Sequence, residues 1–190
     1  MLRWLESILW IVAVVAISVY AGTEGERWLS QAYLDWKFER SLALPPPAVP
    51  PGDIVPYTAQ PLGRLEIPSI HLSAIFVEGV DERVLRRGVG HIPGTALPGM
   101  SGNTGLSAHR DMFFRHLGQI RTGDVIQIST LEGIYEYVVE SFAVVDPDEG
   151  AVLRDVGRPT LTLVTCYPFY YVGPAPKRFV VHASLVTEAP

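Results

Sequence analysis

The sequence predicts a mostly-β domain, built as an antiparallel barrel or an antiparallel sandwich, behind an apolar N-terminal segment. From Pro61 onward, short stretches rich in β-branched and aromatic residues alternate with turns that contain glycine, proline, asparagine and aspartate. Two short helical stretches interrupt them, fewer than the connecting helices that a parallel sheet requires. The length of 190 residues suits one folded domain with accessory segments.

The first 22 residues read MLRWLESILWIVAVVAISVYAG and carry no charged side chain after Glu6. A single-pass transmembrane helix and a cleaved signal peptide both fit this pattern. Trp4 and Glu6 make a poor start for a signal peptide. We therefore favour a retained membrane anchor, formed by residues 1–22. With Arg3 and the amino terminus on the inner side, the rest of the chain is expected on the extracytoplasmic side of the cell membrane.

A juxtamembrane amphipathic helix is expected within residues 23–44, because apolar and aromatic residues recur at four-residue intervals around Trp28 and Trp36. We expect this helix to form a stalk. The alternative is a cap that folds back over a site on the domain. Residues 45–60 are rich in proline and predict an extended, semi-rigid linker. The folded domain then occupies residues 61–190.

Seven stretches of this domain have the composition of β-strands. They span residues 63–70, 72–79, 103–109, 124–130, 133–145, 160–166 and 178–186. Two helical turns are expected at 81–88 and 111–118, each with an aspartate at its start and a glycine at its end. The formal charge of -5 and the lack of a concentrated basic stretch argue against nucleic-acid binding.

Cys166 is the only cysteine in the chain and ends the β-type stretch TLTLVTC. A buried structural cysteine is the ordinary interpretation of such a residue. An unpaired thiol is a liability in an oxidising compartment, however, so in an exported protein it also indicates a free reactive group. Free thiols are mostly protonated at neutral pH, and a nucleophilic cysteine therefore needs a base or a cationic neighbour.

Histidine is the usual partner for such a thiol, and the chain has five. His71, His116 and His182 have ordinary surface or packing interpretations. His91 lies in a loop of glycine and proline and is a second candidate. His109 is the best placed, because it ends the predicted strand NTGLSAH and a side chain at a strand end can reach a cleft.

Arg178 begins the last predicted strand, 12 residues after Cys166. If the two strands pair in antiparallel fashion around a loop, the two side chains meet at one end of the sheet. A guanidinium donates hydrogen bonds and accepts no proton, so Arg178 suits an oxyanion and not the role of general base. A solvated strand start is the ordinary alternative for a single arginine.

Together these stretches resemble the sortases, a family of membrane-anchored cysteine transpeptidases of bacterial surfaces. The likeness extends from about Pro61 to Val186 and rests on the order of NTGLSAHRD, TLTLVTC and KRFVVHA. The tail TLVTCYPFYYVGPAPKRFVVHA is most similar to class D sortases, although Ser107 and Ala108 stand where an alanine-glycine pair is usual. The resemblance implies a closed eight-stranded β-barrel with short helices and with the site at one end.

The resemblance also implies roles for individual residues. Cys166 would be the nucleophile, His109 the acid or base that protonates the leaving amine, and Arg178 the donor to the oxyanion. Thr165 matches the family's threonine before the cysteine and would shape the substrate groove. The implied activity is that of a cysteine peptidase and transpeptidase. It cleaves an LPXTG-like sorting signal, forms a thioacyl-enzyme and passes the acyl group to an amine, which attaches proteins to the cell surface.

The implied partners are surface proteins that bear a sorting signal, the membrane, and an amine acceptor that is a cell-wall precursor or another protein. No cofactor or metal is expected, and a dependence on calcium is left open. One alternative is a non-catalytic surface barrel that binds peptides or glycans and buries an inert Cys166. A second is a cysteine transpeptidase of the L,D type, but the SHGC signature typical of that class is absent from the sequence.

Overall fold

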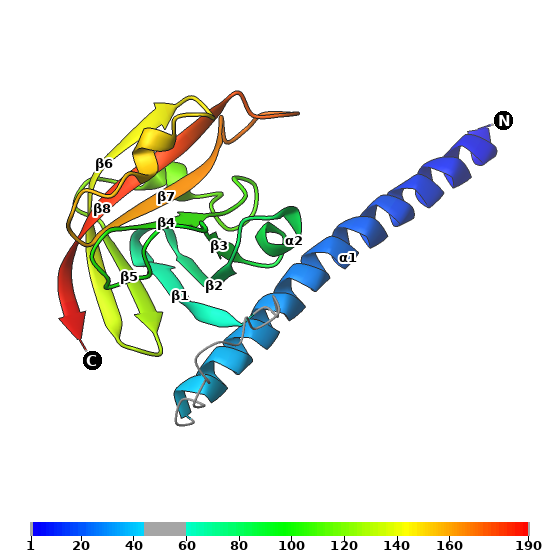
Figure 1. Cartoon of the computed structure of the whole chain (residues 1–190). Coiled ribbons are helices and arrows are strands. Elements are labelled where there is room, and N and C mark those ends of the chain that lie inside the picture. Colours follow the sequence, from blue (N-terminus) through cyan, green and yellow to red (C-terminus); the bar gives the residue numbers. More distant parts are fainter. Residues whose placement is uncertain (1, 44–59, 190) are drawn as a thin grey trace.

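The computed structural model describes residues 2–43 and 60–189, which form one long helix and a closed β-barrel (Figure 1). The expected proline-rich linker lies outside the described residues, apart from Gln60. Eight strands form the barrel. They are β1 (Pro61–Ile67), β2 (Leu72–Glu78), β3 (Val89–His91), β4 (Asn103–Ser107), β5 (Val125–Thr130), β6 (Ile134–Val145), β7 (Thr160–Tyr167) and β8 (Lys177–Ala189). The prediction of a mostly-β, eight-stranded barrel with short helices is confirmed.

The strands follow the order β1-β2-β3-β4-β7-β8-β6-β5 around the closed barrel. Two neighbouring pairs, β2 with β3 and β4 with β7, are parallel, and the other pairs are antiparallel. The expectation of a wholly antiparallel barrel is therefore wrong at these two pairs. Between β4 and β7 the chain forms the β5–β6 pair, and this pair supplies the crossover that a connecting helix supplies in other parallel sheets.

Short helical elements fill the connections. They are η1 (Pro68–Ile70), α2 (Glu82–Leu85), η2 (Leu117–Gln119) and η3 (Gly150–Leu153). The carboxylate of Asp81 caps α2 by accepting hydrogen bonds from the backbone N–H groups of Arg83 and Val84, as expected at a helix start. The second predicted helical turn, 111–118, is a series of turns. Only its last residues belong to a helix, the short η2.

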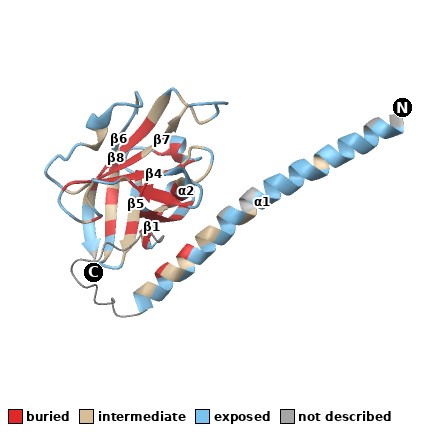
Figure 2. Cartoon of the chain, turned by 45° about the vertical axis from the view of Figure 1, so that its right-hand side comes forward, coloured by how far each residue is buried: buried red, intermediate tan, exposed pale blue. Residues whose placement is uncertain are grey.

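The barrel interior is filled by side chains that alternate along the strands. The pattern is plainest in β1, where every second residue is buried. The side chains of Leu65, Ile126 and Leu161, from three different strands, have no exposed surface. Tyr137 is also fully buried, and its hydroxyl accepts a hydrogen bond of 3.1 Å from the Gly99 N–H. Figure 2 shows this buried interior and the exposed outer rim of the barrel.

A continuous helix, α1 (Leu2–Ala43), runs through the expected boundary between an anchor and an amphipathic helix. Its C-terminal part docks on the barrel, where Leu34 and Phe38 are buried against Ile75, Val77 and Val84. Its N-terminal part projects from the barrel with exposed apolar side chains (Figures 1 and 2). Among residues 2–43 and 60–189, no helix is both long enough and apolar enough to span a bilayer. The predicted transmembrane helix is thus not found.

Polar contacts also tie α1 to the barrel. The side chain of Gln31 accepts a hydrogen bond from the Ile75 N–H (2.9 Å) and donates one to the Arg87 carbonyl (2.5 Å). The guanidinium of Arg64 on β1 contacts Asp35 and Glu39, each at 2.7 Å. The helix therefore lies along β1, β2 and α2.

Candidate active site

Cys166 and Arg178 face each other across two paired strands. In the antiparallel β7–β8 register they are direct partners, and the loop of residues 168–176 joins the two strands just beyond them. The structure thus brings these two residues to one end of the sheet, as their spacing in the sequence predicted. Cys166 is a free, half-buried thiol.

His109 reaches the same end of the barrel from the neighbouring strand. The parallel β4–β7 pairing ends with Ser107 opposite Val164, and the Ala108 N–H continues it with a hydrogen bond of 3.4 Å to the Val164 carbonyl. His109 therefore follows directly beside the segment that carries Cys166. Its side chain keeps 26% of its surface exposed.

Thr165 is buried and turns its hydroxyl toward the strand of the histidine. This hydroxyl donates a hydrogen bond of 2.7 Å to the carbonyl of Ala108, the residue before His109. The contact links the residue before the predicted nucleophile to the residue before the predicted acid/base. The expected role of Thr165 in the substrate groove stays a prediction.

Charged and polar groups contact two of the predicted site residues, His109 and Arg178. The Nε2 atom of His109 lies 3.6 Å from the Glu82 carboxylate, which comes from the start of α2 and also contacts the Arg86 guanidinium at 3.0 Å. The Nη1 atom of Arg178 donates hydrogen bonds to the carbonyls of Lys177 (3.0 Å) and Ala175 (3.4 Å). The end of the β7–β8 loop and the start of β8 thus accept hydrogen bonds from the guanidinium.

The second histidine candidate, His91, is placed differently. It is buried on β3, with Nδ1 at 2.7 Å from the Glu78 carboxylate. Its Nε2 lies 3.0 Å from both the Ala96 carbonyl and the Thr95 hydroxyl. Both ring nitrogens are engaged by groups outside the predicted site, so His91 has a structural setting rather than a catalytic one.

The three remaining histidines have no contact with Cys166 among the described residues. His71 and His116 are exposed. His182 is half-buried on β8, 3.1 Å from the Thr162 hydroxyl. Burial holds the pKa of His182 below its usual 6.5, although the nearby Glu140 carboxylate opposes this shift.

Sequence reasoning missed Arg110, the residue after His109. Its guanidinium donates hydrogen bonds to the carbonyls of Pro168 (2.9 Å), Tyr171 (2.9 Å) and Gly173 (3.1 Å) in the β7–β8 loop. Every residue type has a backbone carbonyl, so the sequence does not show which loop residues will bind an arginine. Only the position of Arg110 next to His109 could have drawn attention to it.

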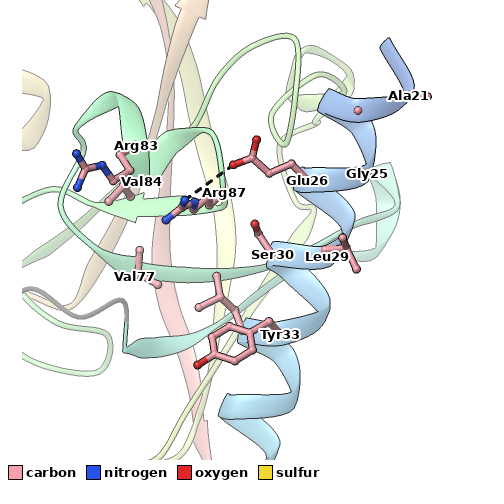
Figure 3. Close-up of a pocket in the computed structure, with 12 residues that line it drawn as sticks. Ala21, Gly25, Glu26, Leu29, Ser30, Tyr33, Val77, Arg83, Val84 and Arg87 are labelled. Atoms are coloured by element: carbon pink, nitrogen blue, oxygen red, sulfur yellow. Dashed lines mark ion pairs between the residues drawn. The ribbon is translucent and has the colours of Figure 1, made fainter. Parts of the chain in front are cut away.

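A cavity of about 750 Å³ lies elsewhere, between α1 and the barrel (Figure 3). Leu29 and Tyr33 line it from α1, and Val77 and Arg87 line it from the barrel side. Arg87 contacts Glu26 of α1 across it at 3.9 Å. None of the predicted site residues lines this cavity. In the described part of the chain, no group of three or more histidine, cysteine or acidic side chains is placed to hold a metal ion.

Comparison with known proteins decides the family. Residues 65–186 match the family model for the sortase domain. The chain belongs to the sortase family. Sortase D of Bacillus subtilis is 38% identical over 133 residues, which cover 70% of this chain and 67% of that protein. Sortase A of Bacillus anthracis is 31% identical over 131 residues, and there the match spans 60% of the relative.

Solved sortase structures share the fold. A sortase D5 transpeptidase from Clostridium perfringens has a TM-score of 0.67 at 24% identity, covering 86% of this chain and 99% of that one. Sortase C-1 from Actinomyces oris has a TM-score of 0.63 at 30% identity, covering 87% and 98%. The expected likeness to class D is confirmed, and the chain is a member of a family of cysteine transpeptidases.

Proposed function

We propose that this sortase cleaves an LPXTG-like sorting signal and transfers the released acyl group to an amine, so that proteins become attached to the cell surface. The observation that carries the proposal is the meeting of three residues at one end of the barrel. Cys166 and Arg178 are register partners on β7 and β8, and His109 follows the strand that pairs with β7. A thiol, an imidazole and a guanidinium supply a nucleophile, a proton carrier and an oxyanion donor.

Acylation begins when the Cys166 thiolate attacks the carbonyl carbon of the scissile peptide bond. A C–S bond forms, and the carbonyl π electrons move to the oxygen, where the Arg178 guanidinium donates hydrogen bonds to the negative charge. The oxyanion then collapses and the C–N bond breaks. Protonated His109 gives its proton to the leaving amine, and a thioester remains on Cys166.

Transfer repeats these steps with a new amine. Its nitrogen attacks the thioester carbon while neutral His109 accepts the proton that the amine loses. The C–S bond breaks, the thiolate of Cys166 is restored, and a new amide bond joins the substrate protein to the amine. Water in place of the amine gives hydrolysis, which is the peptidase side of the same chemistry. The acceptor is an amine of a cell-wall precursor or of another protein.

The direct test is intact-mass analysis of the detergent-solubilised full chain with a panel of LPXTG-like peptides. We expect an acyl adduct on Cys166, which glycine or a diamino acid converts into a ligated peptide. The adduct identifies the signal that is read, and the ligation identifies a transpeptidase. Two results would contradict the proposal. One is peptide ligation by the Cys166→Ala variant, and the other is the absence of an adduct on the wild-type chain with every peptide of the panel.

The rival function is a surface barrel that binds peptides without chemistry. It requires a Cys166 that is inert in the native protein. The half-buried state of this thiol favours the enzyme. Alkylation of the native chain separates the two functions, because the enzyme is modified at Cys166 at a rate that His109→Ala changes, whereas the binding barrel is left unmodified.

We further infer that the N-terminal part of α1 attaches the protein to a membrane, with the barrel on the extracytoplasmic side. From Ile8 to Tyr20 the residues are apolar apart from Ser18 and Tyr20 itself, and most are exposed. Exposed apolar surface of this kind marks a contact with lipid or protein. Cell fractionation with an alkaline wash is the test. Membrane retention that Val14→Lys weakens supports attachment, and a fully soluble wild-type chain overturns it.

A further inference from the structure

Arg110 joins the histidine segment to the loop between the nucleophile and the oxyanion arginine. It follows His109 directly in the sequence. Its Nη1 donates to the Pro168 carbonyl, and its Nη2 donates to the carbonyls of Tyr171 and Gly173, all within 2.9 to 3.1 Å. Its Cζ also lies 5.7 Å from the centre of the Tyr171 ring. One side chain therefore gathers carbonyls from the start and the middle of the loop.

Burial holds only the start of this loop. Phe169 packs against the rings of Phe179 (5.4 Å between centroids) and Tyr167 (6.0 Å). The following residues face solvent, with Tyr170 86% exposed and Val172 99% exposed. Exposed loop tips without apolar contacts are mobile unless hydrogen bonds hold them. The guanidinium of Arg110 supplies such bonds where burial ends.

The shape of this loop decides how its two ends face each other. Cys166 lies two residues before the loop and Arg178 lies two residues after it, and they are partners in the β7–β8 register. Arg178 also donates hydrogen bonds to the loop carbonyl of Ala175 and to the carbonyl of Lys177. A change in loop conformation therefore shifts the donor that faces the oxyanion.

The backbone around Arg110 is itself fixed. The carbonyl of His109 accepts hydrogen bonds from the N–H groups of Met112 and Phe114, both at 3.2 Å. On the other side, Thr165 holds the Ala108 carbonyl at 2.7 Å. The side chain that holds the loop thus extends from a segment that is already bound to the nucleophile strand.

We propose that Arg110 is a positioning residue that keeps Cys166, His109 and Arg178 in one fixed arrangement. This inference rests on the proposed function, since it assigns a task in the same reaction. Arg110 does not touch the reacting atoms. It acts through the β7–β8 loop.

Arginine suits this task for a geometric reason. Its planar guanidinium carries five N–H donors in a fixed fork, so it can bind three carbonyls from one side chain. Lysine carries the same charge on a compact ammonium and does not reproduce the fork. Comparing Arg110→Lys with Arg110→Gln therefore separates the effect of hydrogen-bond geometry from that of charge.

The test compares full-length wild type with Arg110→Gln, Arg110→Lys and the control Arg115→Gln, which changes an exposed arginine in the same turn. Steady-state transfer to an amine gives kcat and KM. We expect Arg110→Gln to lower kcat by about 10-fold to 100-fold, the scale of a small misplacement of catalytic groups, with a smaller change in KM. Arg110→Lys should recover only part of this loss, and Arg115→Gln should behave as wild type.

Amide hydrogen exchange over residues 168–176 supplies a readout that needs no substrate. Both Arg110 variants should exchange faster than wild type in this loop, while the amides of β1 and β5 stay unchanged. Wild-type kcat in Arg110→Gln overturns the proposal, whatever the exchange result. Full recovery in Arg110→Lys also overturns it, because charge alone would then suffice.

These outcomes are distinct from failure of the proposed function. If the wild-type chain transfers no peptide, the function fails, and the exchange comparison still decides whether Arg110 holds the loop. Unchanged exchange in both Arg110 variants overturns the holding role. If Arg110→Gln fails to fold, kcat and loop exchange in Arg110→Lys still decide the question.

Discussion

The interior of the barrel and its active-site end are held together by different forces. Inside, side chains such as Leu65, Ile126 and Leu161 have no exposed surface, and apolar burial fixes them. At the site end, Cys166 and His109 are only half-buried, and hydrogen bonds that neighbouring side chains donate to backbone carbonyls fix their surroundings. Stability and chemistry therefore reside in separate parts of one small domain.

This difference suggests how substitutions should divide. A change in the interior should lower the free energy of unfolding and leave the activity of the folded fraction intact. A change at the site end should lower activity and leave stability nearly intact. Substitutions in the two regions therefore test this division.

Removal of the thiol should give the cleanest separation. We expect Cys166→Ala to abolish the acyl adduct and all transfer, because no other cysteine exists in the chain. The midpoint of thermal unfolding should stay within a few degrees of wild type, since a half-buried sulfur contributes little packing. Intact mass and a thermal melt measure the two effects. A large drop in the melting midpoint would break the comparison.

An interior substitution should do the reverse. Phe76 is fully buried on β2, and Phe76→Ala should cost about 3 to 5 kcal/mol of unfolding free energy through lost burial and the cavity left behind. Leu131→Ala, at a half-exposed turn position, is the matched control and should cost far less. Urea denaturation gives both values. At a temperature low enough to keep Phe76→Ala folded, its turnover per folded molecule should equal that of wild type.

Loss of the proposed oxyanion donor, Arg178, should be the next largest effect. We expect Arg178→Ala to lower kcat by about 10²-fold or more, the usual scale for one such donor. Arg178→Lys should recover little, because an ammonium does not copy the planar fork. Steady-state transfer with wild type and both variants is the measurement. Full activity in Arg178→Ala would move the oxyanion role to backbone N–H groups.

Thr165 lies where the two regions meet, so its substitution should affect both. Thr165→Val keeps the side-chain shape and removes the hydroxyl that binds the Ala108 carbonyl. The buried carbonyl loses a partner, which should cost about 1 to 3 kcal/mol of unfolding free energy. Because Ala108 precedes His109, kcat should fall as well. Urea denaturation and steady-state kinetics report the two losses, and Thr165→Ser should retain most of both quantities.

The smallest expected effect is a dependence of stability on pH that arises far from the thiol. Burial lowers the pKa of His182, so below about pH 6.5 the unfolded state takes up this proton more readily than the folded state. Stability should therefore fall as the pH drops below that value, with Glu140 and Arg158 as the charged neighbours. Urea midpoints of wild type and His182→Gln between pH 7.5 and 5 test this. An equal slope in both proteins would contradict it.

Alternation and spacing predicted much of the barrel. The seven longer strands are stretches of strand-type composition bounded by turn residues, and all seven predicted stretches overlap a strand. The eighth strand, β3, has only three residues, Val89–His91, too few for a period to show. The parallel pairs were missed for a different reason. The pairing of β4 with β7 depends on how β5 and β6 pack as a crossover, and no local pattern records that.

The site was predictable to the extent that its residues carry distinctive chemistry. The strand ends at Cys166 and Arg178 and the antiparallel pairing suffice to bring those two residues together. Glu82 reaches the site from the short helix α2, and Arg110 reaches it from a turn. The loop carbonyls that Arg110 binds lie 58 to 63 positions further along the chain. Contacts of that kind arise only from the folded chain.

The position of β8 in the barrel has a consequence for how the protein is made. β8 is the last of the eight strands in the chain, yet it lies between β7 and β6 in the wall. Until β8 has been synthesised, the other seven strands form at best an open sheet with a gap beside β7, the strand that carries Cys166. Arg178, the proposed oxyanion donor, enters with β8, so a chain that still lacks this strand displays Cys166 without that partner. Barrel closure and the pairing of Cys166 with Arg178 are therefore acquired together.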